Sequence, residues 1–168
     1  MSVTLYDVSA PVFVQGLKGL LGVLEKTKAH VTARNIDPAA LLTARLYPDM
    51  FPLTRQVQIA ADFAKGAVAR LAGLEPPAWD DTEASVEELQ ARLEKTIAYI
   101  ATITPDQING REDRDITLVR RGVESVVKAQ PYLLLQAAPN FYFHLTTAYA
   151  ILRHNGVEIG KKDFLGTA

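Results

Sequence analysis

The spacing of hydrophobic residues predicts four long amphipathic helices. In each of four segments, apolar side chains recur at steps of three, four or seven residues, which places them on one face of an α-helix. The segments are residues 11–31, 52–72, 85–104 and 139–155. Each predicted helix therefore has one face that can be buried against the others.

Capping residues indicate where helices begin and end. Asp37 followed by Pro38 is typical of an N-cap with proline at the first helical position, and it predicts a short extra helix over residues 38–44. Ser85 begins a capping box ahead of the third long helix. Gly156 suits the left-handed position that closes the last long helix.

Two segments between the long helices lack the helical period. Residues 75–81 contain two adjacent prolines and predict a stiff linker. Residues 115–119 and 124–128 are β-branched and flank Gly122, which predicts a small β-hairpin before the last long helix. No repeat or second domain is visible. The sequence therefore predicts one mainly α domain over residues 1–168, a four-helix bundle with a short extra helix and a β-hairpin.

Three glycines interrupt the first predicted helix, at Gly16, Gly19 and Gly22. Each is expected to cost about 1 kcal/mol relative to alanine in a helix interior, so some other interaction should compensate. Close approach of a neighbouring helix is the simpler interpretation. Room for a ligand or for a dimer partner is the alternative.

Composition and charge narrow the class of protein. The chain is 48% hydrophobic and 22% charged, which is typical of a globular domain, and it contains no cysteine. Eighteen basic residues against nineteen acidic ones give a net charge of −1, which argues against a nucleic-acid partner. No secretory signal is recognisable, and no apolar run reaches the roughly 20 residues of a bilayer span. We therefore expect a cytoplasmic protein that binds neither nucleic acid nor membrane.

The candidate chemistry centres on His144. On a helical wheel this imidazole points into the apolar face of the last long helix, and Asn140 lies one turn earlier on the flank of that face. Gln56 lies at the edge of the buried face of the second long helix. A bundle that brings these two helices together can therefore place the three side chains around one partly buried polar spot.

Three interpretations of this polar spot remain open. The side chains can satisfy one another and water, they can line a ligand pocket, or they can hold a metal ion. Imidazole is a good metal ligand, but carboxamides are poor ones. Tyr149 and Trp79 are candidate ligand contacts, although aromatic residues at helical spacing more often belong to a core.

Other polar residues on the helices predict solvated surfaces. The outward positions of the second long helix are Arg55, Gln58, Asp62 and Lys65. Within this stripe Asp62 and Lys65 are expected to form an ion pair, and Glu88 and Arg92 are expected to form an exposed pair on the third long helix. The sequence contains no G-x-S-x-G, glycine-rich phosphate loop, H-E-x-x-H or acidic metal loop, so it does not decide whether the protein is an enzyme.

The sequence also resembles a known family over nearly its whole length. The stretches that carry the resemblance are PNFYFH (139–144), AYAILRHNGV (148–157), GKKDFLG (160–166), LYPDM (46–50) and RLAGLEP (70–76), together with Gln56 and Asp62. They resemble an uncharacterised domain-of-unknown-function family related to the DinB and YfiT-like helical bundles. The resemblance implies a DinB-like bundle and adds to the expectation of a homodimer.

The resemblance also has implications for a metal site. Members of the wider superfamily typically hold a divalent metal with three histidines, one on the second helix and two, four residues apart, on the fourth. Several transfer thiol groups or hydrolyse related conjugates. The resemblance places His144 at the last ligand position, Asn140 at the other position of that helix and Gln56 where the remaining histidine would stand. It therefore implies a degenerate metal site, and we expect neither a metal nor another cofactor.

Our first functional hypothesis is a small-molecule-binding or cryptic-activity bundle that forms a homodimer. The expected ligand-binding residues are His144, Asn140, Gln56, Tyr149 and Trp79. One alternative is a divalent-metal-dependent thiol transferase or hydrolase that keeps His144 as its surviving ligand. Another is a structural dimeric interaction domain.

Overall fold

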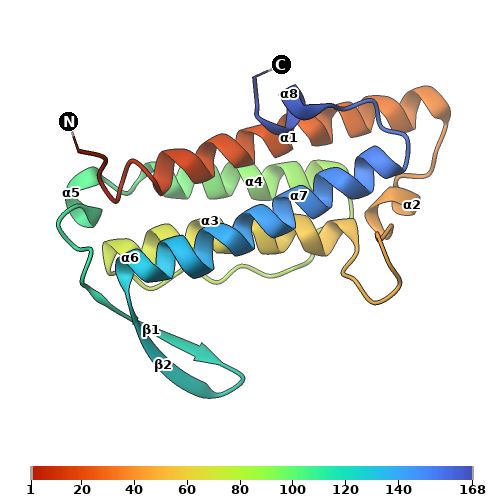
Figure 1. Ribbon diagram of the computed structural model, residues 1–168. Helices are drawn as coiled ribbons and strands as arrows, with labels where there is room; N and C mark the ends of the chain where they lie inside the picture. The colour runs from red at the N-terminus through yellow and green to blue at the C-terminus, as the bar shows by residue number, and fades with distance from the viewer. Residues whose placement is uncertain (1, 168) are drawn as a thin grey trace.

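Four long helices lie side by side along the length of the molecule (Figure 1). They are α1 (Ala10–Arg34), α3 (Leu53–Ala72), α4 (Val86–Ala101) and α7 (Ala138–His154). The computed structural model describes residues 2–167. The mainly helical four-helix bundle is confirmed, and each long helix begins and ends close to its predicted bounds. None of the described helices is long and apolar enough to cross a membrane.

Several short helices lie between the long ones or follow the last of them. They are α2 (Pro38–Leu42), α5 (Pro105–Ile108), α6 (Ala129–Tyr132), the π-helical segment η1 (Leu133–Ala137) and α8 (Lys161–Phe164). The predicted extra helix is α2, and the side chain of Asp37 accepts a hydrogen bond from the N–H of Ala39 at 3.0 Å. The other four segments were not predicted, because four or five residues are too few to show a hydrophobic period.

The predicted β-hairpin is confirmed and projects from one side of the bundle (Figure 1). Strands β1 (Asp115–Arg120) and β2 (Val123–Lys128) pair antiparallel, with Asp115 opposite Lys128. Arg121 and Gly122 connect them with φ angles of 51° and 77°, as a two-residue turn of type I′ requires. Ile116 and Leu118 are buried, so the hairpin is joined to the bundle by one apolar face.

The core depends on short side chains along α3. Five alanines of this helix are completely buried, at Ala60, Ala61, Ala64, Ala67 and Ala69. The side chains at a helix contact set the distance between the helix axes, so alanine allows neighbouring helices to approach closely. The most extensive contact of α3 is with α7. This close approach brings the side chains at the edges of the two helices within hydrogen-bonding distance.

The glycines of α1 also reflect close packing. A Cβ atom added at Gly16 would lie 2.8 Å from the ring of Phe141 on α7, and one added at Gly19 would overlap the carbonyl oxygen of Phe164 on α8. No atom lies within 4 Å of a Cβ added at Gly22. The interpretation as close approach of neighbouring segments is therefore confirmed at two of the three positions.

The end of α7 follows the predicted Schellman arrangement. Gly156 has a φ of +91°, a left-handed conformation that favours glycine. The N–H of Val157 donates to the carbonyl oxygen of Leu152 at 3.1 Å, and Val157 is completely buried. The chain then turns back across α1, where α8 packs.

We predict opposite effects of alanine at two glycines of α1. Gly19→Ala should lower the free energy of unfolding by about 1–3 kcal/mol, because the backbone of Phe164 blocks the added methyl group. Gly22→Ala should raise it by up to about 1 kcal/mol, because the site is open and alanine favours the helix. Urea denaturation followed by circular dichroism measures both changes. Equal effects of the two substitutions would contradict the packing described.

Candidate functional site

The packing of α3 on α7 brings Gln56 and His144 into contact. The Nδ1 atom of His144 lies 2.7 Å from the Oε1 atom of Gln56. The Gln56 side chain is buried, whereas His144 is half-buried. Two of the three side chains expected around the polar spot therefore meet directly.

A chain of hydrogen bonds sets the tautomer of His144. The Nε2 atom of Gln56 donates to the carbonyl oxygen of Phe51 at 3.0 Å, which directs the amide oxygen of Gln56 toward the imidazole. An amide oxygen can only accept a hydrogen bond, so Nδ1 of His144 must be the protonated nitrogen. Nε2 of the neutral ring therefore keeps its lone pair.

Aromatic rings and a nearby charge favour the neutral form of His144. The ring of Phe63 stacks on the imidazole with centroids 6.0 Å apart, and the ring of Phe143 meets it edge-on at 5.2 Å. Burial lowers the pKa of His144 below its usual value, and the positive charge of Arg55 lowers it further. At neutral pH the side chain is therefore an uncharged imidazole.

The Nε2 atom of His144 is available to a ligand. No group in residues 2–167 makes a hydrogen bond to it. This atom is also open to solvent. Among residues 2–167 only one side-chain nitrogen or oxygen is both fully buried and without a partner, and that atom is Nε of Arg92. An imidazole lone pair that is open to solvent can accept a hydrogen bond from a bound molecule.

The other expected ligand contacts lie apart from this pair. Asn140 donates from Nδ2 to the carbonyl oxygen of Gln136 at 2.7 Å, so its amide is directed at its own helix. Tyr149 packs edge-on against Phe164, with ring centroids 5.6 Å apart. Trp79 lies on the linker after α3 and packs against Tyr99 of α4. No ring contact joins Tyr149 or Trp79 to His144 in the described chain, so their roles as ligand contacts stay predictions.

The side chains around His144 do not fit a three-ligand site for a divalent metal. Within residues 2–167 no group of three or more His, Asp or Glu side chains is placed to hold a metal ion. His144 uses Nδ1 on Gln56, and the Asn140 amide is directed at the backbone. A single imidazole nitrogen falls short of the three protein ligands that a catalytic zinc site uses.

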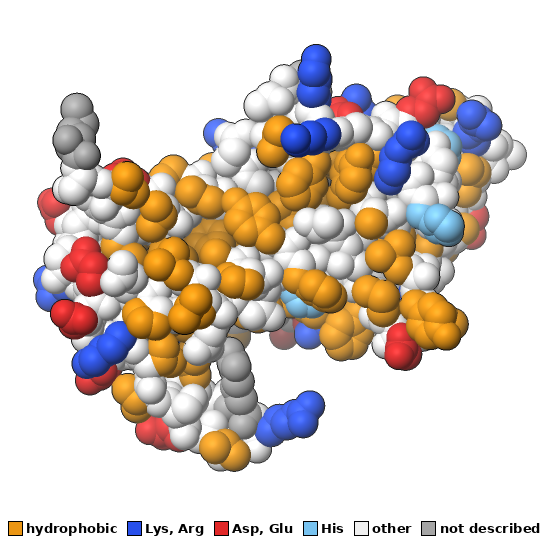
Figure 2. Space-filling view, in the orientation of Figure 1, with side chains coloured by type: hydrophobic (Ala, Val, Ile, Leu, Met, Phe, Trp, Pro, Cys, Tyr) orange, Lys and Arg blue, Asp and Glu red, His pale blue; other side chains and the backbone are white. Residues whose placement is uncertain are grey.

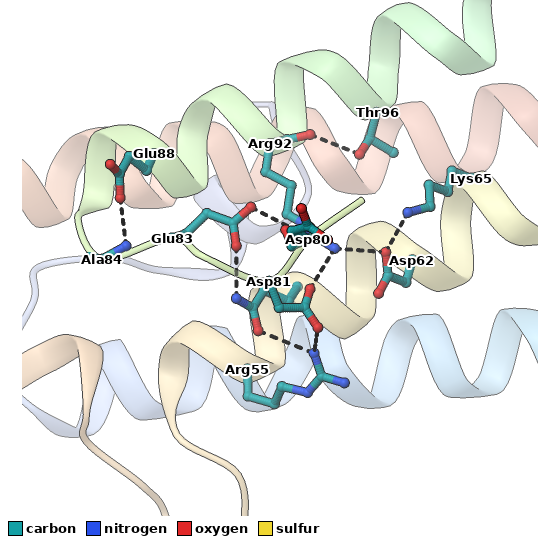
Figure 3. Close-up of polar contacts among 11 residues, drawn as sticks. Arg55, Asp62, Lys65, Asp80, Asp81, Glu83, Ala84, Glu88, Arg92 and Thr96 are labelled. Atoms are coloured by element: carbon teal, nitrogen blue, oxygen red, sulfur yellow. Dashed lines mark hydrogen bonds and ion pairs between the residues drawn. The ribbon is translucent and has the colours of Figure 1, made fainter. Parts of the chain in front are cut away.

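A second polar cluster lies where the linker crosses α3 and α4. Figure 3 shows the acidic side chains of the linker pointing at basic side chains of the two helices. Arg92 of α4 is at the centre, with nitrogen–oxygen distances of 2.9 Å to Asp62, 2.9 Å to Asp81 and 2.8 Å to Glu83. Its side chain is only 2% exposed. The linker thus supplies two of the three carboxylates that neutralise a buried guanidinium.

The predicted solvated stripe of α3 is wrong. Gln58 and Lys65 are only 4% and 5% exposed, because the linker covers this face of the helix. The amide of Gln58 donates to Glu83 at 2.8 Å, and Arg55 forms an ion pair with Asp81. A helical wheel shows one helix in isolation and cannot show what lies over it.

One predicted ion pair is confirmed and the other is wrong. Lys65 and Asp62 pair at 2.7 Å, as the sequence predicts. Arg92 instead turns inward to the linker, and Glu88 accepts a hydrogen bond from the N–H of Ala84 at 2.6 Å. The signal that could have revealed this is the acidic run DDTE over residues 80–83, which follows a helix with inward-facing basic residues.

Charges in this cluster balance closely. Three cations, Arg55, Lys65 and Arg92, meet three carboxylates, Asp62, Asp81 and Glu83. Burial opposes ionisation of Glu83, but hydrogen bonds from Arg92 and Gln58 prevail and hold its pKa below the usual value. The buried Nε of Arg92 has no partner, which costs about 1–3 kcal/mol. The cluster is therefore well paired but not fully satisfied.

The four-helix bundle with its small β-hairpin has a DinB-like fold. A crystal structure described as a DinB family member protein from Shewanella denitrificans matches it with a TM-score of 0.88 and 38% sequence identity. The match covers 98% of this chain and 93% of that chain. Residues 5–165 match the family described as a domain of unknown function, DUF1993, and the chain belongs to this family. A comparison with curated proteins found no match.

Proposed function

We propose that the protein binds a small molecule beside α3 and α7, with Nε2 of His144 as the polar anchor. The observation that carries this proposal is the hydrogen-bond chain from Phe51 through Gln56 to His144. These two hydrogen bonds orient the imidazole, and Nε2 of His144 keeps a lone pair that is open to solvent.

The surroundings of Nε2 suggest the chemistry of the ligand. A lone pair requires a ligand that donates a hydrogen bond, such as a hydroxyl group. The rings of Phe63 and Phe143 favour a flat, apolar body next to that group. The positive charge of Arg55 disfavours a cation. A neutral, hydroxyl-bearing ligand therefore suits the site, whereas the donor set gives no support to a divalent-metal-dependent thiol transferase or hydrolase.

We predict that phenol binds more tightly than anisole, its methyl ether. The two probes share a ring, but only phenol can donate a hydrogen bond to Nε2 of His144. The difference should be about fivefold in Kd, since one neutral hydrogen bond contributes about 1 kcal/mol. Chemical-shift titrations of the side-chain amide of Gln56 and the rings of Phe63 and Phe143 measure both affinities.

His144→Phe is the matched control, because it keeps an aromatic ring and removes the acceptor. In this variant phenol and anisole should bind equally. Equal binding of the two probes to the natural chain, or shifts confined to other parts of the molecule, would contradict the proposal.

The outer surface of α7 favours a second proposal, that the protein is a dimeric interaction domain. No Asp, Glu, Lys or Arg occurs from Ala129 to Leu152. Hydrophobic side chains gather on the face shown in Figure 2, and exposed apolar residues of this segment include Leu135 at 76% and Phe143 at 57%. A surface helix without charge is unusual in a monomer and typical of an interface core.

The shape of this face suits a second copy of the chain. A hollow of about 280 Å³ between α1 and α7 is lined by Gly16, Leu145 and Phe164, and Tyr142 forms part of its wall. Tyr142 and Phe143 also border a shallower hollow beside Leu46. The face thus carries both projecting rings and hollows that can receive them. An uncharged surface meets its own copy across a two-fold axis without like-charge repulsion.

We predict that Leu135→Glu/Thr146→Glu abolishes dimerisation. Leu135 is an exposed residue of η1 and Thr146 an exposed residue of α7, and neither makes a hydrogen bond or ring contact with His144, so the ligand site is untouched. Sedimentation velocity at several concentrations should show a dimer for the natural chain and an 18.4 kDa monomer for the variant. Val119→Glu, at an exposed apolar position of the hairpin, should leave the dimer intact. A persistent monomer of the natural chain would contradict the proposal.

A further inference from the structure

The linker between α3 and α4, residues 74–85, contains no helix or strand and is called the strap below. None of its side chains is fully buried. The buried core ends at Leu71 of α3 and resumes at Val86 of α4. Hydrophobic burial therefore contributes little to holding the strap in place, in contrast to every long helix of the bundle.

Charged contacts hold the strap instead. Asp81 pairs with Arg55 of α3 and with Arg92 of α4, and Glu83 accepts hydrogen bonds from Arg92 and Gln58 (Figure 3). The charged groups at this contact are Arg55, Asp62 and Lys65 on α3, Glu88, Arg92 and Lys95 on α4, and Asp80, Asp81 and Glu83 on the strap. The backbone carbonyl of Asp80 also accepts a hydrogen bond from Arg92 at 3.1 Å, and Lys65 and Lys95 lie over the ring of Trp79. Contacts to charged side chains of α3 and α4 thus attach the strap.

The helices beneath the strap have a core of their own. Leu89, Leu93 and Ile100 of α4 are fully buried, and α4 contacts α1 and α3 along its length. Trp79 is the one ring that the strap contributes, and it is only partly buried against Tyr99. Detachment of the strap therefore breaks ion pairs, the ring contact of Trp79 with Tyr99 and the cation–π contacts of Trp79 with Lys65 and Lys95, but leaves the apolar core in place.

We propose that the strap is an electrostatic latch that opens as a unit while the four-helix bundle stays folded. Opening replaces the carboxylates of Asp81 and Glu83 with water and presents Arg55, Lys65 and Arg92 to solvent. It also opens the cavity of about 520 Å³ that Trp79, Glu83 and Arg92 line in the closed state.

Acid should favour the open state. The pKa of Glu83 is held below its usual value of 4.5 in the closed state by Arg92 and Gln58. The stabilising contribution of this carboxylate is therefore complete above the usual value and is lost as the pH falls through the lowered one. Protonation of Glu83 weakens its hydrogen bond with Arg92. Arg92 lies on α4 and contacts carboxylates of both α3 and the strap, so the attachment of the strap weakens as well.

Trp79 reports the position of the strap, because it is the single tryptophan of the chain. Asp81→Asn/Glu83→Gln removes the two strap charges that contact Arg55 and Arg92, and at neutral pH we expect acrylamide to quench Trp79 fluorescence at least about twofold more strongly than in the natural chain. Far-UV circular dichroism should show the same helix content. Asp49→Asn/Glu94→Gln, which removes two exposed carboxylates outside the cluster, should change neither signal.

An acid titration of the natural chain provides an independent test that requires no substitution. Quenching of Trp79 should rise at a higher pH than the loss of helical signal. Unchanged quenching in the strap variant would overturn the proposal. Exposure of Trp79 only together with loss of helix, in the variant or in acid, would overturn it as well, since the strap would then be part of the same cooperative unit as the bundle.

Discussion

The close packing of α3 against α7 is the constraint on which the rest of the structure depends. Small side chains along α3 allow this approach, and it sets the distance across which Gln56 meets His144. The direction of a side chain is fixed by its position on the helix. One turn of α3 therefore serves two polar regions, with Gln56 directed to α7 and Arg55 and Gln58 directed to the strap.

The amide of Gln56 determines which nitrogen of His144 can bind a ligand. The amide oxygen of Gln56 binds the proton on Nδ1, and the carbonyl of Phe51 holds the amide in that orientation. The pair therefore offers one oriented lone pair, on Nε2 of His144. The fold matches that of the DinB family structure, and within residues 2–167 no group of three or more His, Asp or Glu side chains is placed to hold a metal ion.

The elements of the fold could be predicted from the sequence because their signals are local. The hydrophobic period and the capping residues of each long helix lie within that helix or next to it, and they predicted the helices. The turn at Gly122 lies within the hairpin and predicted it in the same way. The contact of Gln56 with His144 was also foreseeable, since both lie at the inner edges of their helices. The burial of Lys65 and Arg92 was not, because it depends on the path of a loop over two helices. The loop is held by ion pairs between residues far apart in the sequence, and such pairs produce no periodic pattern that a sequence can show.

The most direct test of the account is the protonation of His144, followed by long-range ¹H–¹⁵N NMR across a pH titration. We predict a neutral ring with the proton on Nδ1, and a pKa below the usual 6.5 because burial and Arg55 disfavour the charged form. The contribution of this residue to stability is then complete above the usual value and is lost as the pH falls toward the lowered one. A proton on Nε2 with Nδ1 bare, or a pKa above the usual value, would contradict the account.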